Sequence, residues 1–117
     1  MSEKFLVTGA NGCIGAWVVK QLLEQDIEVT AFDLKADEHR HLLINNGSMP
    51  KANWAFGDLT VAQDVEDAMA GVTHVVHLAA LQVPFCRANP ALGASVNVVG
   101  TVNIFEAAKK LGVKNIS

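Results

Sequence analysis

Short apolar runs alternate with longer amphipathic segments along the chain. The runs are apolar at nearly every position, which is typical of strands buried on both faces of a sheet. These predicted strands are residues 4–8, 28–33, 54–57 and 74–80, with a fifth strand beginning in residues 113–117. Between the strands, helical spacing of apolar residues and capping signals predict helices at residues 14–25, 38–45, 61–69 and 91–111.

Local signals define the ends of these predicted helices. Thr60 and Gln63 have the spacing of a capping box, in which both side chains pair with backbone N–H groups at a helix start. Gly71 ends that helix, and Gly112 is suited to cap the long helix. The expected buried stripe of the long helix is Val98, Val102, Phe105 and Ala108.

The alternation of strands and helices predicts parallel β-α-β units. Helices of about 10 to 20 residues can return the chain to the start of the next parallel strand. Right-handed crossovers then produce a doubly wound parallel sheet. No repeat, linker or low-complexity tract divides the sequence. We therefore expect residues 1–117 to form one α/β domain that is incomplete, because its sheet is truncated in the fifth strand.

Composition and charge narrow the classes of partner. Of the 117 residues, 50% are hydrophobic and 18% are charged, and the net charge of -3 argues against nucleic acid or an anionic membrane as a partner. Polar residues interrupt the apolar runs, and the N-terminus lacks a signal-peptide pattern. Cys13, Cys86 and the four histidines lack metal-ligand spacing, and His74 and His77 are expected to satisfy local hydrogen bonds. We expect a cytoplasmic protein with no metal.

A glycine-rich stretch, TGANGCIG at residues 8–15, follows the first predicted strand and opens the first helix. A helix N-terminus offers free N–H groups and a partial positive charge to a phosphate. We expect Gly9 to make the tight turn, Gly12 to let a pyrophosphate approach, and Gly15 to let the helix pack closely on the sheet. The stretch lacks the Gly-Lys-Ser/Thr ending of a nucleoside-triphosphate loop, so it predicts a dinucleotide site.

Three further motifs follow in a fixed order. They are GDLT at residues 57–60, HLAA at 77–80 and NVVGTVNIFEAAKKLGVKN at 97–115. Together with TGANGCIG they resemble the extended branch of the short-chain dehydrogenases/reductases, which contains NAD-dependent epimerases, dehydratases and related oxidoreductases. The resemblance covers the whole chain and implies that residues 1–117 are a Rossmann-like, NAD(P)-binding domain.

The resemblance also implies which residues surround the cofactor. The phosphates would be lined by Gly9, Asn11, Gly12, Cys13, Ile14 and Gly15. The adenosine and the central ribose would be surrounded by Asp33, Leu34, Asp58, Leu59, Leu78, Ala79 and Ala80. Asn97 matches a position that contacts the cofactor or supports the active site. Cys13 departs from the family pattern, where an aromatic residue is usual, and its smaller side chain leaves the pyrophosphate less covered.

Asp33, at the expected end of the second strand, bears on the choice between NAD and NADP. A carboxylate there accepts hydrogen bonds from both ribose hydroxyls of NAD and repels the 2′-phosphate of NADP. Lys35 would soften this discrimination, and the alternative is that Asp33 is only a surface residue in a turn. We expect the cofactor to be NAD, with NADP less favoured.

The family's chemistry needs residues that we cannot assign in this chain. It uses a tyrosine and a lysine four residues later, and the lysine lowers the pKa of the tyrosine so that a proton moves while the nicotinamide exchanges a hydride. The 117 residues contain no tyrosine, so we assign no catalytic residue.

Two functions follow from the sequence. The first is the NAD-binding portion of an epimerase/dehydratase-type oxidoreductase that acts on a sugar nucleotide or another hydroxyl or ketone compound and forms a homodimer when full-length. Residues 1–117 alone would then be inactive. The second is a non-catalytic NAD(P)-binding regulatory module. A Tyr-x-x-x-Lys motif after residue 117 would favour the enzyme.

Overall fold

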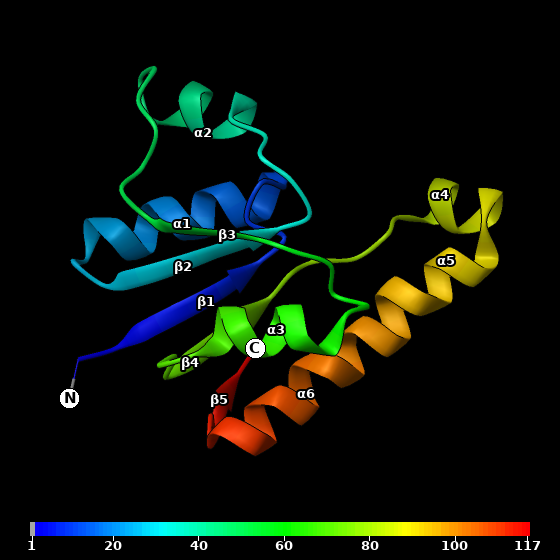
Figure 1. Cartoon of the computed structure of the whole chain (residues 1–117). Helices are drawn as coiled ribbons and strands as arrows, with labels where there is room; N and C mark the ends of the chain where they lie inside the picture. Colours follow the sequence, from blue (N-terminus) through cyan, green and yellow to red (C-terminus); the bar gives the residue numbers. More distant parts are fainter. Residues whose placement is uncertain (1) are drawn as a thin grey trace.

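A single parallel sheet organises the computed structural model, which describes residues 2–117. Its five strands lie in the order β3-β2-β1-β4-β5 (Figure 1). They are β1 (Lys4–Thr8), β2 (Glu28–Asp33), β3 (Asn53–Phe56), β4 (His74–His77) and β5 (Asn115–Ile116). All four neighbouring pairs are parallel, which confirms the predicted doubly wound α/β fold. The strand order reverses direction between β1 and β4, where such folds bind their ligands.

Helices cover both faces of this sheet. Helix α1 lies on one face with α2 beside it, whereas α3 and α6 lie on the other (Figure 1). The helices are α1 (Cys13–Glu24), α2 (His39–Ile44), α3 (Ala62–Met69), α4 (Val83–Ala88), α5 (Pro90–Ala94), a π-helical turn η1 (Ser95–Val99) and α6 (Gly100–Leu111). Each predicted strand and helix is present; β1 and β2 have the predicted bounds, and the ends of the others differ by at most three residues.

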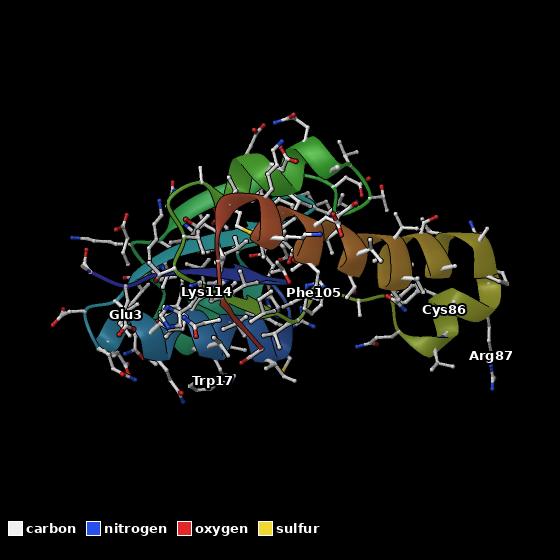
Figure 2. All side chains as sticks on the ribbon, turned by 90° about the horizontal axis from the view of Figure 1, so that it is seen from below. Glu3, Trp17, Cys86, Arg87, Phe105 and Lys114 are labelled. Carbon is white, nitrogen blue, oxygen red and sulfur yellow. The ribbon has the colours of Figure 1, made fainter. Side chains whose placement is uncertain are left out.

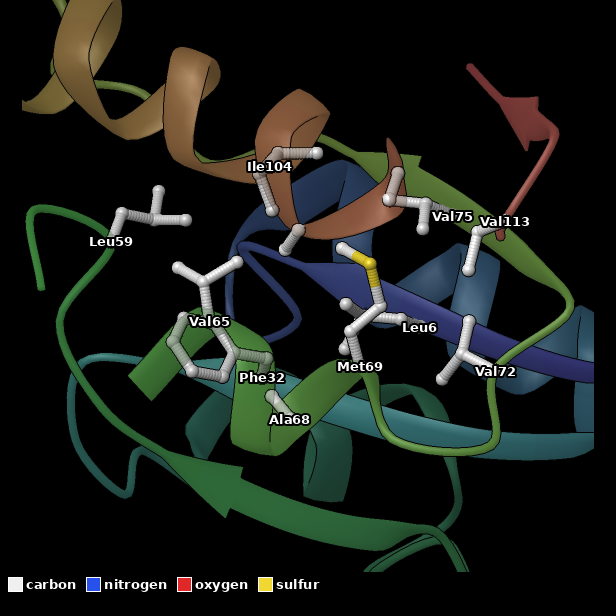
Figure 3. Packing of buried hydrophobic residues seen from close by; sticks show 12 residues of the cluster. Leu6, Phe32, Leu59, Val65, Ala68, Met69, Val72, Val75, Ile104 and Val113 are labelled. Atoms are coloured by element: carbon white, nitrogen blue, oxygen red, sulfur yellow. The ribbon is translucent and has the colours of Figure 1, made fainter. Parts of the chain in front are cut away.

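The two faces of the sheet have separate cores because neighbouring side chains of a strand point to opposite faces. Leu6 packs with Met69 and Ile104 under α3 and α6 (Figure 3), and the adjacent Val7 packs with Val19 under α1. All five side chains are at most 1% exposed. This alternation fixes the register of β1 and therefore where its carboxyl end lies.

The capping box predicted at the start of α3 is wrong. The residue that precedes the helix is Val61, and no side chain caps the first turn. The Thr60 hydroxyl instead donates to Asp58 Oδ1 at 2.7 Å, and the Gln63 amide donates to Asp67 Oδ1 at 2.8 Å. The helix begins at Ala62, one residue later than predicted, so Thr60 is not its N-cap residue, and the hydroxyl donates to the charged Asp58 carboxylate instead.

The buried stripe predicted for the long helix is also wrong, except at Ala108. Val98, Val102 and Phe105 are 52–60% exposed, whereas Ile104 is 1% exposed. The π-helical turn η1 shifts the register of the helix by one residue, because it makes hydrogen bonds five rather than four positions apart. Gly112 does cap the helix, with a left-handed φ of 76°.

The segment that follows β4 differs from the prediction. The expected strand at 74–80 ends at His77, and a short helix, α4, forms before the predicted long helix, where the sequence indicated neither a strand nor a helix. Figure 2 shows this segment, with Cys86 and Arg87, extending beyond the rest of the molecule. Among the described residues, Pro90–Leu111 alone has the length and composition to cross a membrane, a test that core helices of soluble proteins also pass.

Candidate functional site

A cavity of about 650 Å³ opens at the carboxyl ends of β1, β2 and β4, where the strand order reverses. Its walls come from the glycine turn, the ends of β2 and β4, the loop before α3, and the segment from α5 to η1. The lining residues are Gly9, Gly12, Cys13, Ile14, Gly15, Phe32, Asp33, Leu34, Gly57, Asp58, Leu59, Thr60, Leu78, Ala79, Ala80, Leu81, Gln82, Leu92, Ser95 and Val96. Most of this lining is apolar, as in other small-molecule sites.

The glycine turn brings three backbone segments together. Gly9 has a left-handed φ of 66°, and a Cβ atom on it would lie 2.9 Å from the nitrogen of Ala79. A Cβ atom on Gly15 would overlap the carbonyl oxygen of Gly9 and lie 2.9 Å from the Cα atom of Ala10. The role predicted for Gly9 as the turn residue is thus confirmed. Gly15 packs α1 against the turn itself rather than against the sheet.

The first turn of α1 faces the cavity with free N–H groups. Gly12 precedes the helix, and neither a side-chain cap nor an acidic residue is found at the start of the helix. A Cβ atom on Gly12 would meet only the carbonyl oxygen of Gly9, at 3.2 Å. The lining residues include neither lysine nor arginine, so the helix N-terminus is the positive end of the cavity. This arrangement suits the diphosphate of a dinucleotide.

Asp33 lies at the end of β2, on the cavity wall beside the glycine turn. Its Oδ2 atom accepts a hydrogen bond from the backbone nitrogen of Asn11 at 2.9 Å, and its Oδ1 atom accepts one from the nitrogen of Leu34 at 2.7 Å. Each carboxylate oxygen has a second lone pair, so both keep the capacity to accept from a ligand hydroxyl. The two backbone donors hold the carboxylate in one orientation.

A second carboxylate, Asp58, lies on the cavity wall in the loop after β3, beside the end of β2. Its backbone nitrogen donates to Asp64 Oδ2 at 2.9 Å, and its Oδ1 atom accepts from the Thr60 backbone nitrogen and hydroxyl. The backbone of the next residue, Leu59, is held by α6, because the Asn103 amide donates to its carbonyl oxygen at 2.8 Å. Helix α6 therefore helps to position the loop between β3 and α3.

A hydrogen-bond chain runs from β1 through His77 to α6. Thr8 Oγ1 accepts from the backbone nitrogens of Leu78 and Ala79, so its own hydrogen points to His77 Nδ1, 2.6 Å away. His77 Nε2 must then carry the proton and donate to Thr101 Oγ1 at 3.0 Å. Burial lowers the pKa of His77, which agrees with this neutral form. These hydrogen bonds fix the backbone of Leu78 and Ala79, which line the cavity just after β4.

The side chain of Asn97 pairs with the backbone of Leu81. Its Oδ1 atom accepts from the Leu81 nitrogen at 2.7 Å, and its Nδ2 atom donates to the Leu81 oxygen at 3.0 Å. The backbone oxygen of Asn97 accepts the Thr101 hydroxyl at 2.8 Å. Asn97 lies in the π-helical turn η1, a kind of turn that is frequent at functional sites. It supports the cavity wall without lining it.

Twelve of the residues singled out in the sequence line this one cavity. They are Gly9, Gly12, Cys13, Ile14, Gly15, Asp33, Leu34, Asp58, Leu59, Leu78, Ala79 and Ala80. Asn11 and Asn97 are not among the lining residues, and both use their side chains to hold neighbouring backbone. Sequence reasoning missed eight lining residues. Phe32, Gly57 and Thr60 are neighbours of predicted ones, whereas Leu81, Gln82, Leu92, Ser95 and Val96 come to the cavity only through the π-helical turn and the fold of α4 and α5.

Comparison with known proteins identifies relatives of the whole described chain. The model of the NAD dependent epimerase/dehydratase family matches residues 5–117. The UDP-glucose 4-epimerase of Rickettsia bellii (strain RML369-C) is 34% identical over 116 residues, which cover 92% of this chain and 33% of that protein. The UDP-glucose 4-epimerase of Rickettsia canadensis (strain McKiel) is 33% identical over 124 residues, covering 99% and 36%. The chain thus spans about a third of the length of these curated relatives.

Solved structures share both the fold and part of the sequence. The UDP-glucose 4-epimerase of Thermus thermophilus, in complex with NAD, has a TM-score of 0.82 and 32% identity over 97% of this chain and 36% of its own. The dTDP-glucose 4,6-dehydratase of Streptomyces venezuelae, also with NAD bound, has a TM-score of 0.81 and 28% identity over 97% and 38%. This chain belongs to the NAD-dependent epimerase/dehydratase family.

Proposed function

We propose that residues 1–117 bind NAD and form the cofactor-binding portion of an epimerase/dehydratase-type oxidoreductase. One observation carries the proposal: a single cavity has the uncapped N-terminus of α1 at one wall and the oriented carboxylate of Asp33 at another. Free N–H groups suit a diphosphate, and a carboxylate suits a ribose diol. The groups on these two walls therefore suit the two ends of an adenosine diphosphate.

Each wall has a distinct task in this proposal. Gly12 lets the diphosphate reach the start of α1, and Asp33 accepts the hydroxyls of the adenosine ribose. Asp58 and Leu59 bound the adenine end, and residues 78–80 lie along the central ribose. When bound, NAD supplies a hydride acceptor at its nicotinamide ring. The residues of this chain bind and orient the cofactor, and the apolar lining excludes water.

The substrate we propose is a nucleotide sugar. The support comes from the relatives, since the two Rickettsia proteins are UDP-glucose 4-epimerases and the Streptomyces venezuelae protein is a dTDP-glucose 4,6-dehydratase. We also propose a homodimer for the full-length protein. The exposed apolar side chains of Val102 and Phe105 on α6 support an interface there, because soluble proteins rarely leave clustered apolar surface uncovered.

Residues 1–117 supply binding rather than turnover in this proposal. The tyrosine that resembling enzymes use for proton transfer does not occur in the 117 residues. A full-length gene product with NAD-dependent activity would support the enzyme. NAD binding without any turnover by that product would instead favour a regulatory module.

Calorimetric titration of the purified protein with NAD and NADP tests the proposed cofactor. We expect NAD to bind at least about tenfold more tightly, because hydrogen bonds to an ionised acceptor contribute about 1.5–3 kcal/mol each and NADP loses them. Asp33→Asn keeps an acceptor oxygen for the backbone N–H of Asn11 but removes the charge, so it should narrow the difference between the cofactors. Asp33→Ala should weaken NAD further. Equal affinities of the parent protein for NAD and NADP, or no binding of either, would contradict the proposal.

A further inference from the structure

Asn11 ties the glycine turn to the segment that follows β2. Its backbone nitrogen donates to Asp33 Oδ2 at 2.9 Å, and its Nδ2 atom donates to the oxygen of Lys35 at 2.8 Å. Its backbone oxygen accepts from Arg40 Nη1 at 3.2 Å, and its Oδ1 atom lies 3.1 Å from His41 Nε2. All four polar groups of Asn11 are therefore bonded to residues between 33 and 41.

His41 is the buried member of this cluster. It is 0% exposed, whereas His39 and Arg40, its two predecessors in α2, are exposed. Its ring meets the edge of Trp54 with centroids 4.9 Å apart and planes at 81°. Among the described residues, the Nδ1 atom has no hydrogen-bond partner. Burying an imidazole with an unpaired ring nitrogen is costly, and the side-chain partner of the ring is Asn11.

The direction of this contact follows from the other bonds of Asn11. The Nδ2 atom donates to Lys35, so the Oδ1 atom is the side that faces His41 and can only accept. His41 Nε2 must therefore carry a hydrogen and donate. Desolvation by burial lowers the pKa of His41. It outweighs the Ala10 backbone and the charges of Asp37 and Asp33, which raise that pKa. The lowered pKa is consistent with a neutral ring whose Nδ1 atom carries no hydrogen.

We propose that His41 is a positioning residue for the NAD site. By holding Asn11, it fixes the backbone N–H group that orients the carboxylate of Asp33, although His41 does not line the cavity. This inference rests on the proposed function. Without the His41 contact, Asn11 samples other arrangements, and the apparent affinity for NAD falls in proportion to the fraction of molecules with a competent turn.

Paired substitutions at positions 41 and 39 test the role. His41→Phe keeps a ring against Trp54 but removes the Nε2–H donor. It should weaken NAD binding about tenfold, because leaving the buried Asn11 Oδ1 atom without a hydrogen bond costs about that factor. His41→Gln places an amide donor near the former Nε2 atom and should bind within about threefold of the parent. His39→Phe and His39→Gln alter the exposed start of the same helix and should leave the affinity unchanged.

A second measurement needs no cofactor. Hydrogen exchange at the Asn11 amide should be faster in His41→Phe than in the parent protein and restored in His41→Gln, with unchanged protection in the core of β1. If His41→Phe does not fold, the ¹⁵N chemical shifts of the His41 ring in the parent protein test the role instead. The proposal requires a hydrogen on Nε2 and none on Nδ1. Failure of the parent to bind NAD would overturn the proposed function alone. Unchanged Asn11 exchange in folded His41→Phe, or a bare Nε2, would overturn the role of His41.

Discussion

Gly12 and Gly15 lie three positions apart in the same turn, yet an added methyl group would meet different surroundings. At Gly15 it would overlap the carbonyl oxygen of Gly9, a backbone atom that cannot move aside by a side-chain rotation. At Gly12 it would lie 3.2 Å from that oxygen and otherwise face the cavity. The same substitution should therefore damage the fold at one position and the binding site at the other.

We predict that Gly15→Ala lowers the free energy of unfolding by about 3 kcal/mol or more, because either the turn or α1 must move. Gly12→Ala should change it by less than about 1 kcal/mol while weakening NAD binding at least about tenfold, since the methyl group stands before the free N–H groups of α1. Urea denaturation and calorimetry of both variants separate the effects. A stable Gly15→Ala protein, or a Gly12→Ala protein with normal affinity, would contradict these assignments.

Residues whose position in the fold is set locally could be placed from the sequence, and residues whose position depends on tertiary contacts could not. Gly9, Gly12 and Asp33 lie at the end of a strand or the start of a helix, which periodicity reveals. His41 is different, since its burial depends on Trp54 of β3 and on Asn11 of the turn. Nothing in the polar segment around it signals either contact.

The long helix shows the same limit at the level of an element. Two overlapping apolar stripes run along α6, one through Val102 and Phe105 and one through Ile104 and Ala107, and periodicity alone does not say which faces the sheet. The π-helical turn η1 shifts the register before α6 begins, and its hydrogen bonds are not evident from the pattern of apolar residues. The existence of the helix could be predicted, but not its buried face.

Neighbouring positions in α6 provide a direct test of which face is buried. Ile104→Ala should lower the free energy of unfolding by about 2–4 kcal/mol, because Ile104 is 1% exposed within the core under α3 and α6. Phe105→Ser should change it by less than about 1 kcal/mol in the monomer, since that ring is 54% exposed. Denaturant midpoints of the two variants measure the difference between these two losses of stability. Similar losses would indicate that the helix is rotated from the orientation described.

For the whole molecule, the buried His41 and the half-buried His77 make stability depend on pH. Burial lowers the pKa of both His41 and His77 in the folded state, whereas in the unfolded chain each titrates near the ordinary value of 6.5. As the pH falls through that value, the unfolded chain takes up protons before the folded one does. Stability should therefore be fully present above about pH 6.5 and decline as the medium becomes more acidic.

Urea midpoints between about pH 7.5 and 5.5 measure this dependence, in a window above the titration of most carboxylates. The parent protein should unfold at lower urea concentration at the acidic end. A double variant, His41→Gln with His77→Gln, should show a flatter profile, because neither position can then take up a proton on unfolding. A parent profile that is flat or rises toward acid would contradict the neutral forms assigned to both rings.

The central strand β1 pairs with β2 on one side and with β4 on the other, and Thr8 and His77 are 69 positions apart. On the ribosome, synthesis proceeds from the N-terminus at about 5–20 residues per second, so β1 waits about 3–14 s for its second neighbour. During that interval β1, α1 and β2 are already available to each other, while the edge of β1 that will receive β4 is open. A nascent chain stalled before residue 74 would therefore expose this edge to chaperones or to other strands.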